Sequence, residues 1–291
     1  MIIDYGLLMI GVEEDSFTDT EAGLGAKHLG VDIAGLRTYN FLRKTLKEHY
    51  MDLRGVILAG GTGSRLMPLT KVTNKHLLPI GQKPMIYYPI EKLTAVGISE
   101  ILIVTGVEHM GDVVSLLGSG KGFNCRFTYK VQDEAGGIAQ ALGLAENFAN
   151  AGKLAVILGD NIFEANLKKY ADKFLAQKAG ARLLLKQVPD PKRFGVAQIS
   201  GNKVAGIEEK PKKPKSDYAV TGIYFYDSAV FEIIRTLKPS GRGELEITDV
   251  NNAYISKGRL DYDIIEGWWS DAGTFESLKR VNELVAQEPP Q

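Results

Sequence analysis

Short apolar runs alternate with stretches of helical periodicity between residues 52 and 189. The apolar runs predict strands at residues 55–59, 101–105, 126–131, 153–158 and 182–188. Helical periodicity fills the intervals at 85–96, 111–117, 138–148 and 167–178. Alternation of this kind favours a parallel sheet covered by helices on both faces. Ligands of such sheets bind beyond the carboxyl ends of the strands, so the polar residues at those ends are the first candidates for function.

The pattern changes after Pro189. A hairpin is predicted from strands at 195–200 and 203–208 that meet at Gly201-Asn202. Further strands are expected at 218–226 and 260–265, and helices at 228–237, 248–257 (capped by Thr248 or Asp249) and 274–286. We therefore predict an α/β fold of the Rossmann-like three-layer type, with a central, mostly parallel mixed sheet. The second half adds a β-rich layer to this sheet.

Residues 1–50 do not share this pattern. Residues 1–12 are mildly apolar, residues 13–30 are acidic and small without a clear period, and residues 36–50 fit a short amphipathic helix. Three interpretations stay open: an upstream start codon that is rarely used, a disordered leader, or a docking segment. The first two together are favoured because chain termini are usually loosely held. The main domain is predicted to span residues 51–291.

Composition narrows the class of protein. Lysines plus arginines and aspartates plus glutamates each number 35 in 291 residues, so no basic surplus points to nucleic acid. The single cysteine, Cys125, excludes an intrachain disulfide, and the four histidines lack zinc-ligand spacing. No apolar run approaches the roughly 20 residues of a membrane span, and no signal peptide is evident. We expect a cytoplasmic protein that binds neither nucleic acid nor membranes.

A glycine-rich loop follows the first predicted strand. The apolar run 56–59 ends abruptly in Gly60-Gly61-Thr62-Gly63. Glycines permit backbone conformations in which successive N–H groups form a nest for anionic oxygens. A loop of this kind is as often a simple tight turn. The dinucleotide fingerprint is absent because Leu66 stands at its third glycine position, and the P-loop pattern is absent as well.

Two aspartates and a glutamine stand at other strand ends. Asp160 follows the strand 153–158, and Asp271 lies in Trp269-Ser-Asp-Ala-Gly-Thr274. Each aspartate alone could equally be a helix cap or a turn residue. Together they suggest two hard oxygen ligands for a Mg²⁺ ion that is otherwise held by water and phosphates. Gln132 could pair with a pyrimidine edge through one donor and one acceptor, or could be an ordinary loop residue.

The string G-G-x-G-x-R-L-x-P-x-T-x-x-x-x-K-x-L-L-P-x-x-x-K-P-M, from Gly60 to Met85, resembles the nucleotide-binding signature of the sugar nucleotidyltransferases. Segments at 132–141, 159–161, 208–211, 242–250 and 269–274 also match that family, and its thymidylyl branch in particular. The resemblance covers about residues 54–285 and is to a short form of the family. It implies a nucleotide-binding part at about 54–188 and a sugar-binding part at about 189–291.

The resemblance assigns roles to individual residues. Those that it implies are catalytic are Arg65, Lys75, Asp160, Lys210 and Asp271, with Asp160 and Asp271 binding Mg²⁺ as the cofactor. Those that it implies bind the nucleotide are Leu58, Gly60, Gly61, Gly63, Gln132 and Gly137. Those that it implies bind the sugar phosphate are Gly195, Glu209, Lys210, Tyr218 and Val220. Three residues depart from the family's usual pattern: Asp133 and Ala135 replace prolines, and His76 replaces a glutamine near the base or deoxyribose.

The activity that the resemblance implies is transfer of dTMP from dTTP to α-D-glucose 1-phosphate, which gives dTDP-glucose and pyrophosphate. The expected partners are therefore these two substrates, and we expect a homo-oligomer. Two alternatives stay open. One is the same transfer with another base or sugar phosphate, for example with UTP. The other is a non-catalytic sensor of nucleotide sugars on the same fold, which would predict loss of the charged residues that this chain retains.

Overall fold

The computed structural model describes residues 53–290. The predictions for residues 1–50, including the amphipathic helix at 36–50, lie outside the described residues. Within residues 53–290, no helix has the length and apolar character that crossing a bilayer would require.

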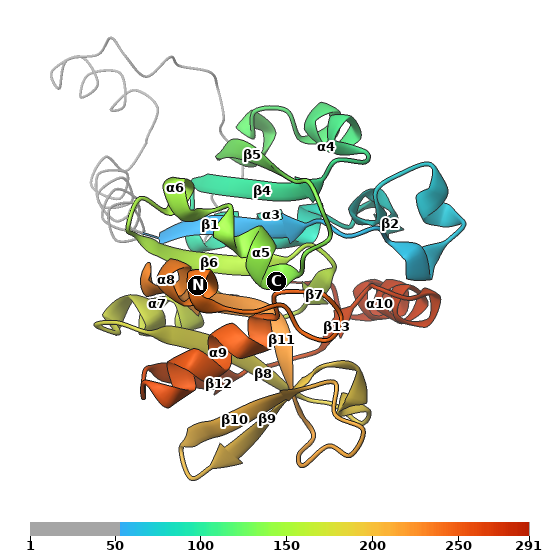
Figure 1. Cartoon of the computed structure of the whole chain (residues 1–291). Helices are drawn as coiled ribbons and strands as arrows, with labels where there is room; N and C mark the ends of the chain where they lie inside the picture. Colours follow the sequence, from blue (N-terminus) through green and yellow to red (C-terminus); the bar gives the residue numbers. More distant parts are fainter. Residues whose placement is uncertain (1–52, 291) are drawn as a thin grey trace, which may run out of the picture. The chain divides into compact units, whose positions relative to one another are not determined.

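One nine-stranded sheet forms the centre of the described chain (Figure 1). Its parallel part has the order β5–β4–β1–β6, and strand β1 pairs in parallel with both β4 and β6. These strands are β1 (Leu53–Ala59), β4 (Glu100–Gly106), β5 (Arg126–Gln132) and β6 (Lys153–Leu158). Because they are parallel, their carboxyl ends lie at one edge of the sheet, where the predicted glycine loop, Gln132 and Asp160 follow.

The second half of the chain extends the same sheet. Strand β11 (Tyr218–Tyr226) pairs antiparallel with β6, β8 and β9. Strands β9 (Gly195–Ser200) and β10 (Lys203–Glu209) form the predicted hairpin, and β12 (Leu260–Ile264) runs parallel to β8 (Ala181–Gln187). The predicted α/β fold with a mixed sheet is confirmed. The strands of the second half join the parallel part of the sheet through β11, which pairs antiparallel with β6.

Strand β1 shows why the sheet is covered on both faces. Val56 and Leu58 belong to one buried cluster, whereas Leu53, Ile57 and Ala59 belong to another. This separation follows from the alternation of side chains along a strand. The first cluster includes helices α5 (Ile138–Gly143), α6 (Glu146–Ala149), α8 (Ala229–Thr236) and α9 (Ile247–Ser256). The second includes α3 (Tyr87–Val96), α4 (Met110–Leu117) and α7 (Lys168–Ala176).

Two short ribbons and the last helix complete the described fold. Strand β7 (Asn161–Phe163) pairs antiparallel with β13 (Trp269–Asp271), and β2 (Pro79–Ile80) pairs with β3 (Lys83–Pro84). Helix α10 (Phe275–Gln287) begins with a capping box made by Thr274 and Ser277. Short 3₁₀ turns lie at Ser64–Leu66, Leu69–Lys71, Lys75–Leu77, Lys121–Phe123 and Pro191–Arg193.

Three local predictions were wrong. The helix predicted at 138–148 is interrupted after Gly143, because the helix breaks where glycine lowers its stability and Leu144 N–H bonds to Ala141 O. Helix α9 begins at Ile247 after Glu246 without a side-chain cap, because the Thr248 hydroxyl donates to Glu209 instead. No strand was predicted between residue 265 and the helix at 274–286, but residues 269–271 form β13, whose pairing with β7 joins residues far apart in the sequence.

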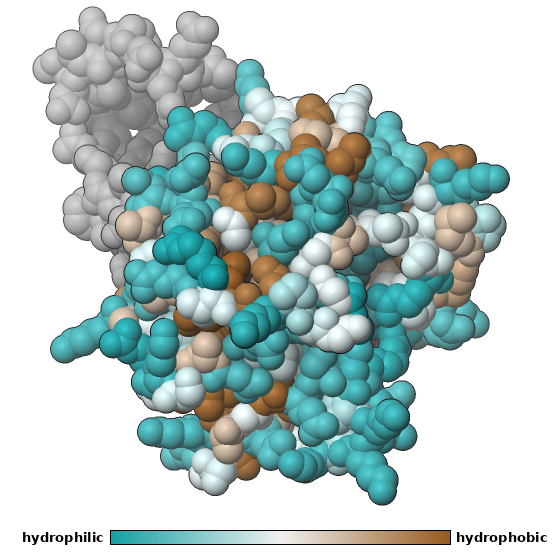
Figure 2. Space-filling model, viewed as in Figure 1, coloured by the Kyte–Doolittle hydropathy of each residue, from teal (hydrophilic) through white to brown (hydrophobic). Residues whose placement is uncertain are grey.

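Polar side chains predominate on the face shown in Figure 2, and apolar ones are scattered among them in small patches. The larger exposed apolar side chains of the described residues include Met67, Leu69 and Val72 in the loop after β1, and Val107 after β4. Scattered exposure of this kind is normal for a protein surface.

Candidate active site

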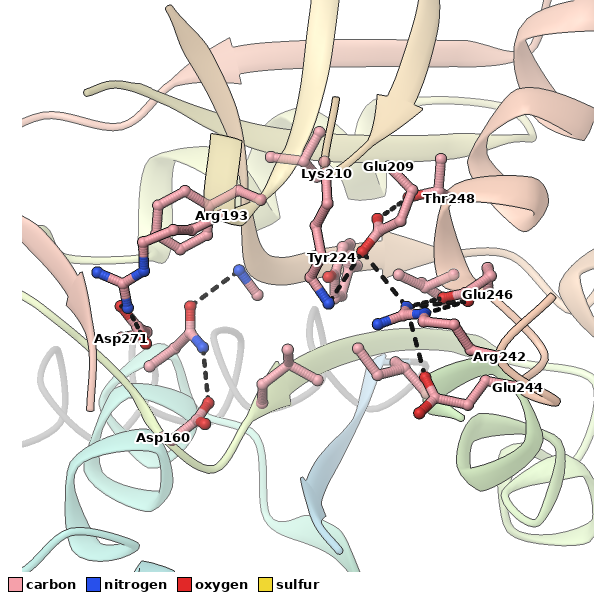
Figure 3. A pocket seen from close by; sticks show the side chains of 18 of the residues that line it. Asp160, Arg193, Glu209, Lys210, Tyr224, Arg242, Glu244, Glu246, Thr248 and Asp271 are labelled. Atoms are coloured by element: carbon pink, nitrogen blue, oxygen red, sulfur yellow. Dashed lines mark hydrogen bonds and ion pairs between the residues drawn. The ribbon is translucent and has the colours of Figure 1, made fainter. Parts of the chain in front are cut away.

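An open pocket lies beyond the carboxyl end of β6 and is bounded by β9, β11 and the segment that includes β13 (Figure 3). Asp160, Asp271 and Arg193 lie at one end, and Glu209, Lys210, Thr248 and Arg242 lie at the other. The residues that line it are Arg65, Ile138, Leu158, Asp160, Asn161, Arg193, Phe194, Gly195, Glu209, Lys210, Val220, Gly222, Tyr224, Arg242, Glu244, Glu246, Ile247, Thr248, Trp269 and Asp271.

The two aspartates are brought together by the β7–β13 ribbon. Asn161 pairs with Asp271 in this ribbon, and Ala272 N–H donates to Asp160 O at 2.8 Å. A Cβ atom on Gly273 would lie 3.1 Å from Asp271 Oδ2, 3.4 Å from Arg65 Nη2 and 3.6 Å from Asp160 Oδ2. Glycine at residue 273 therefore leaves open a small space that two carboxylates and a guanidinium surround.

Asp160 is held by Lys75. Lys75 Nζ lies 2.5 Å from Asp160 Oδ2, and both side chains are largely buried. Burial raises the pKa of the Asp160 carboxyl, but the charge of Lys75 and hydrogen bonds from Lys75 and Asn161 act in the opposite direction, and the net pKa lies well below its usual value. Asp160 is therefore ionised at neutral pH.

Asp271 has a different cationic partner. Arg193 Nη2 lies 3.2 Å from both Asp271 carboxylate oxygens, and Gly273 N–H donates to Asp271 Oδ2 at 3.2 Å. The Arg193 guanidinium lies 5.4 Å from the ring centroid of Phe194, and that ring packs edge-on against Trp269 at 5.1 Å. Trp269 and Asp271 both belong to β13, so the ring that packs against Phe194 and the carboxylate that pairs with Arg193 are carried by one short strand.

Asn161 ties this end of the pocket to the sheet. Its Oδ1 accepts hydrogen bonds from Gly222 N–H at 2.9 Å and from Trp269 Nε1–H at 2.8 Å. Its Nδ2 donates to Asp160 Oδ1 at 3.0 Å. Asn161 is buried, so these bonds satisfy polar groups that cannot reach water. One amide thereby ties Asp160 and strand β13, which carries Asp271, to β11.

The other end of the pocket is a network of glutamates and cations. Glu209 Oε2 accepts a hydrogen bond from the Thr248 hydroxyl at 2.6 Å, and Glu209 Oε1 lies 3.5 Å from Lys210 Nζ. Arg242 donates to both carboxylate oxygens of Glu246, and its Nη2 lies 3.7 Å from Glu209 Oε1. Lys210 has a φ of +43°, a conformation that is uncommon outside glycine and is often found at functional sites.

The predicted base-binding residues form a neighbouring cluster. Gln132 Nε2 donates to Gly137 O at 3.1 Å and to Gln140 Oε1 at 2.7 Å. A Cβ atom on Gly60 would lie 2.7 Å from Gln132 Oε1, so the glycine loop and Gln132 are directly adjacent. Gly63 is equally constrained, since a Cβ there would lie 2.8 Å from Thr70 Cγ2 and 3.1 Å from Thr70 Cβ. Glycine at both positions permits close approach that a larger residue would block.

His76 is buried beside Asn74 and Gly159. Its Nδ1 lies 2.7 Å from Asn74 Oδ1, an acceptor that assigns the ring proton to Nδ1. A Cβ atom on Gly159 would lie 3.1 Å from His76 Nε2, directly before Asp160. Burial, with a smaller contribution from the charge of Lys75, lowers the pKa of His76 to about 3. His76 is therefore a neutral ring near neutral pH and adds no charge to the site.

The structure places most of the predicted site residues in or beside the pocket. Arg65, Asp160, Gly195, Glu209, Lys210, Val220 and Asp271 line it, and Lys75 contacts it through Asp160. Leu58 and Tyr218 pack instead against the buried cluster under α5, α8 and α9. Within residues 53–290 no group of three or more His, Cys, Asp or Glu side chains could enclose a metal. Two carboxylates beside the open space at Gly273 suit an ion that keeps water and phosphate ligands.

Sequence reasoning missed functional candidates that only folding reveals. Arg193 and Asn161 were not singled out, although Arg193 lies two residues before Gly195, to which the resemblance assigned sugar-phosphate binding, and Asn161 belongs to the matching segment 159–161. Arg242 was noted only as part of a matching segment, and Thr248 only as a possible cap. These residues could have been identified because they lie in or next to segments that match the family. The residues they contact lie far away in the sequence, so the contacts themselves could not have been predicted.

A family model identifies the class of protein to which this fold and this arrangement of charges belong. Residues 54–288 match the family model described as Nucleotidyl transferase, and the chain therefore belongs to the nucleotidyl transferase family.

Curated relatives in this family include a glucose-1-phosphate thymidylyltransferase of Neisseria meningitidis, which is 44% identical over 237 residues, covering 80% of this chain and 82% of the relative. The corresponding protein of Mycobacterium tuberculosis is 42% identical over 236 residues, with coverage of 80% and 82%. A crystal structure from Bacillus anthracis, in complex with sucrose and provisionally assigned as a glucose-1-phosphate thymidylyltransferase, is 62% identical. It aligns with a TM-score of 0.78 over 80% of this chain and 94% of that one.

A UDP-glucose pyrophosphorylase in complex with UDP-glucose has the same fold. It is 24% identical and aligns with a TM-score of 0.71 over 80% of this chain and 98% of that one. At this level of identity, the similarity extends to the fold alone.

Proposed function

We propose that the protein transfers a thymidylyl group from dTTP to α-D-glucose 1-phosphate, with release of pyrophosphate. An oxygen of the sugar phosphate attacks the α-phosphorus of dTTP in line, and the bond from that phosphorus to the bridging oxygen of pyrophosphate breaks. The observation that carries the proposal is the two-ended pocket. Its one end has paired aspartates with Arg65, Lys75 and Arg193, and its other end has Glu209 with Lys210 and Arg242. The names of the similar proteins support the same reaction.

The nucleotide is proposed to bind to residues from the first part of the chain. Arg65 and Lys75 neutralise the triphosphate and the departing pyrophosphate, because guanidinium and ammonium groups bind phosphate oxygens well. The backbone of the glycine loop (Gly60, Gly61, Gly63) approaches the phosphates closely. Gln132 and Gly137 lie together at the end of β5 and are proposed to contact the thymine. Their present hydrogen bond must then rearrange in part when a base binds.

The sugar phosphate is proposed to bind at the opposite end of the pocket. Glu209 is fixed by Thr248 and accepts hydrogen bonds from sugar hydroxyls, while Lys210 binds the sugar's phosphate. Gly195 and Val220 offer backbone groups beside them. The division into a nucleotide part at 54–188 and a sugar part at 189–291 is proposed on the same grounds, with Asp271 reaching back from the second part to the first.

Asp160 and Asp271 are proposed to hold Mg²⁺. When bound, this ion would neutralise charge on the α-phosphate. The protein contributes little covalent chemistry to such a transfer. Its own residues act mainly by positioning two anionic substrates and by countering the repulsion between them.

The test is pyrophosphate release by the purified full chain with Mg²⁺ and glucose 1-phosphate, comparing dTTP, UTP, CTP, GTP and ATP. A strong preference for dTTP is expected. Equal use of dTTP and UTP would contradict the thymidylyl assignment while keeping the transfer, and no release with any nucleotide would indicate a non-catalytic sensor.

Two variants with matched controls test the roles. Asp271→Asn and Arg65→Ala are each expected to lower kcat about 10²- to 10³-fold, the range for loss of a preorganised charged group. Asp261→Asn and Arg126→Ala make the same chemical changes at exposed positions on β12 and β5, and their activity is expected to stay within a few-fold of wild type. A kcat for Asp271→Asn equal to that of Asp261→Asn would show that the role given to Asp271 is wrong.

A further inference from the structure

Both carboxylates at the metal end of the pocket already have cationic partners. Lys75 Nζ lies 2.5 Å from Asp160 Oδ2, and Arg193 Nη2 lies 3.2 Å from both oxygens of Asp271. By contrast, Arg65 has no ion-pair partner among the residues that the structure describes, although its Nη2 would lie 3.4 Å from a Cβ on Gly273. The site is therefore nearly self-neutralised, and Arg65 is the cation left available.

The ion pairs at Asp160 and Asp271 oppose the binding of a divalent cation more than they oppose the binding of a polyphosphate. A metal ion that arrives alone must displace an ammonium or a guanidinium from each carboxylate, and the displaced cations then repel it. A polyphosphate brings new acceptors for those same cations, since arginine and lysine both bind phosphate oxygens. When the cations turn to the phosphates, the carboxylate oxygens become free for the metal.

Arg193 is placed to make such an exchange. It ends the short turn Pro191–Arg193, its guanidinium rests against Phe194, and its side chain is 41% exposed, so it can reorient without opening the core. Asp271 is 16% exposed and is kept in place by the Gly273 N–H and the β13 strand. The aspartate is thus fixed, whereas the arginine is the partner that can leave.

We propose that Arg193 is a positioning residue that pairs with Asp271 in the free protein and yields it when a nucleoside triphosphate binds, while Lys75 does the same at Asp160. Divalent metal then binds together with the nucleotide's phosphates rather than ahead of them. The inference rests on the proposed function only in that a nucleoside triphosphate is the ligand. It requires neither a particular base nor turnover.

The first measurement is Mn²⁺ binding to the full chain without nucleotide, by electron paramagnetic resonance of the free ion. Arg193→Gln is expected to bind Mn²⁺ up to about fivefold more tightly than wild type, because a partly exposed ion pair contributes modestly. Lys75→Gln is expected to show an increase at least as large, since its pair is more buried. Arg193→Lys keeps a cation and should resemble wild type. Arg242→Gln removes a cation from the far end of the same pocket and should also resemble wild type.

The second measurement is dTTP binding by equilibrium dialysis with and without Mn²⁺ and without glucose 1-phosphate. Wild type should bind dTTP more tightly when Mn²⁺ is present, since coupling between two ligands is reciprocal. Arg193→Gln should show weaker coupling, because its Asp271 is available beforehand.

The outcomes separate this inference from the proposed activity. Wild-type protein that binds Mn²⁺ equally tightly with and without dTTP, or a folded Arg193→Gln variant with unchanged Mn²⁺ affinity, would overturn the exchange. A loss of Mn²⁺ affinity in Arg193→Gln would also overturn it, because a purely structural role predicts that direction. Failure of pyrophosphate release in the substrate test, with the Mn²⁺ results as expected, would refute the activity and leave the exchange standing.

Discussion

Gly137 joins two segments that are proposed to bind different substrates. Gly136 O accepts a hydrogen bond from Leu245 N–H at 2.8 Å, and Ala139 N–H donates to Leu245 O at 3.1 Å. Gly137 lies between these bonds with φ +98° and ψ 171°, a region that is essentially restricted to glycine. The loop after β5 is thereby attached to the segment that carries Arg242, Glu244 and Glu246.

Replacing Gly137 with alanine should therefore damage both segments. The added Cβ would lie 2.5 Å from Leu245 O and 2.8 Å from Leu245 N, which are backbone atoms that cannot rotate away. The conformational strain alone costs about 1–3 kcal/mol. Displacing Leu245 removes up to two backbone hydrogen bonds at about 1 kcal/mol each. We expect a total loss of about 2–4 kcal/mol in the free energy of unfolding.

Urea denaturation measures this loss, and Gly243→Ala is the matched control. Gly243 lies in the attached segment with φ +75°, and a Cβ atom there would meet nothing within 4 Å, so alanine introduces strain without a clash. That control is expected to lose about 1–2 kcal/mol. In steady-state kinetics, Gly137→Ala should raise KM for dTTP and for glucose 1-phosphate together. If Gly137→Ala matched Gly243→Ala in stability, or raised only one KM, the coupling of the two segments would be refuted.

Two further predictions concern buried groups beside the pocket. Below pH 6.5 the unfolded chain protonates His76, whereas the native ring stays neutral down to about pH 3, so the native state loses stability as pH falls through this window. His76→Gln should reduce the difference in unfolding free energy between pH 7.5 and pH 5 by about 2 kcal/mol, measured in urea; an unchanged difference would contradict the neutral ring. Asn161→Ala should cost about 2–4 kcal/mol by the same method, because Gly222 N–H and Trp269 Nε1–H lose their acceptor inside the protein. A loss below about 1 kcal/mol would mean that Asn161 does not fix these strands.

Much of the fold could be predicted from the sequence because its determinants are local. The strand at 153–158 and the strand at 218–226 were predicted with the bounds that the structure has, since an apolar or alternating run and its breakers lie within one short stretch. The string from Gly60 to Met85 and the later matching segments predicted the family, which the family model confirms. The carboxyl-end positions of Gln132 and Asp160 followed from the order of strands and helices.

Contacts between distant residues were decided only by the tertiary structure. Arg193 and Asp271 are 78 residues apart, Asn161 and Trp269 are 108 apart, and Lys75 and Asp160 are 85 apart. Periodicity and turn chemistry describe neighbours along the chain, so they could suggest that these residues matter but not which residue pairs with which. The pairing β7–β13, the attachment of Leu245 to the loop of Gly137 and the burial of His76 likewise depend on how the strands are ordered in the sheet. The sequence by itself determined most of the strands and helices and pointed to charged residues of the site such as Asp160 and Asp271, but not to Arg193. The packing of the sheet decided which charges meet, because ion pairs and buried hydrogen bonds form only between groups that the fold brings within a few ångströms.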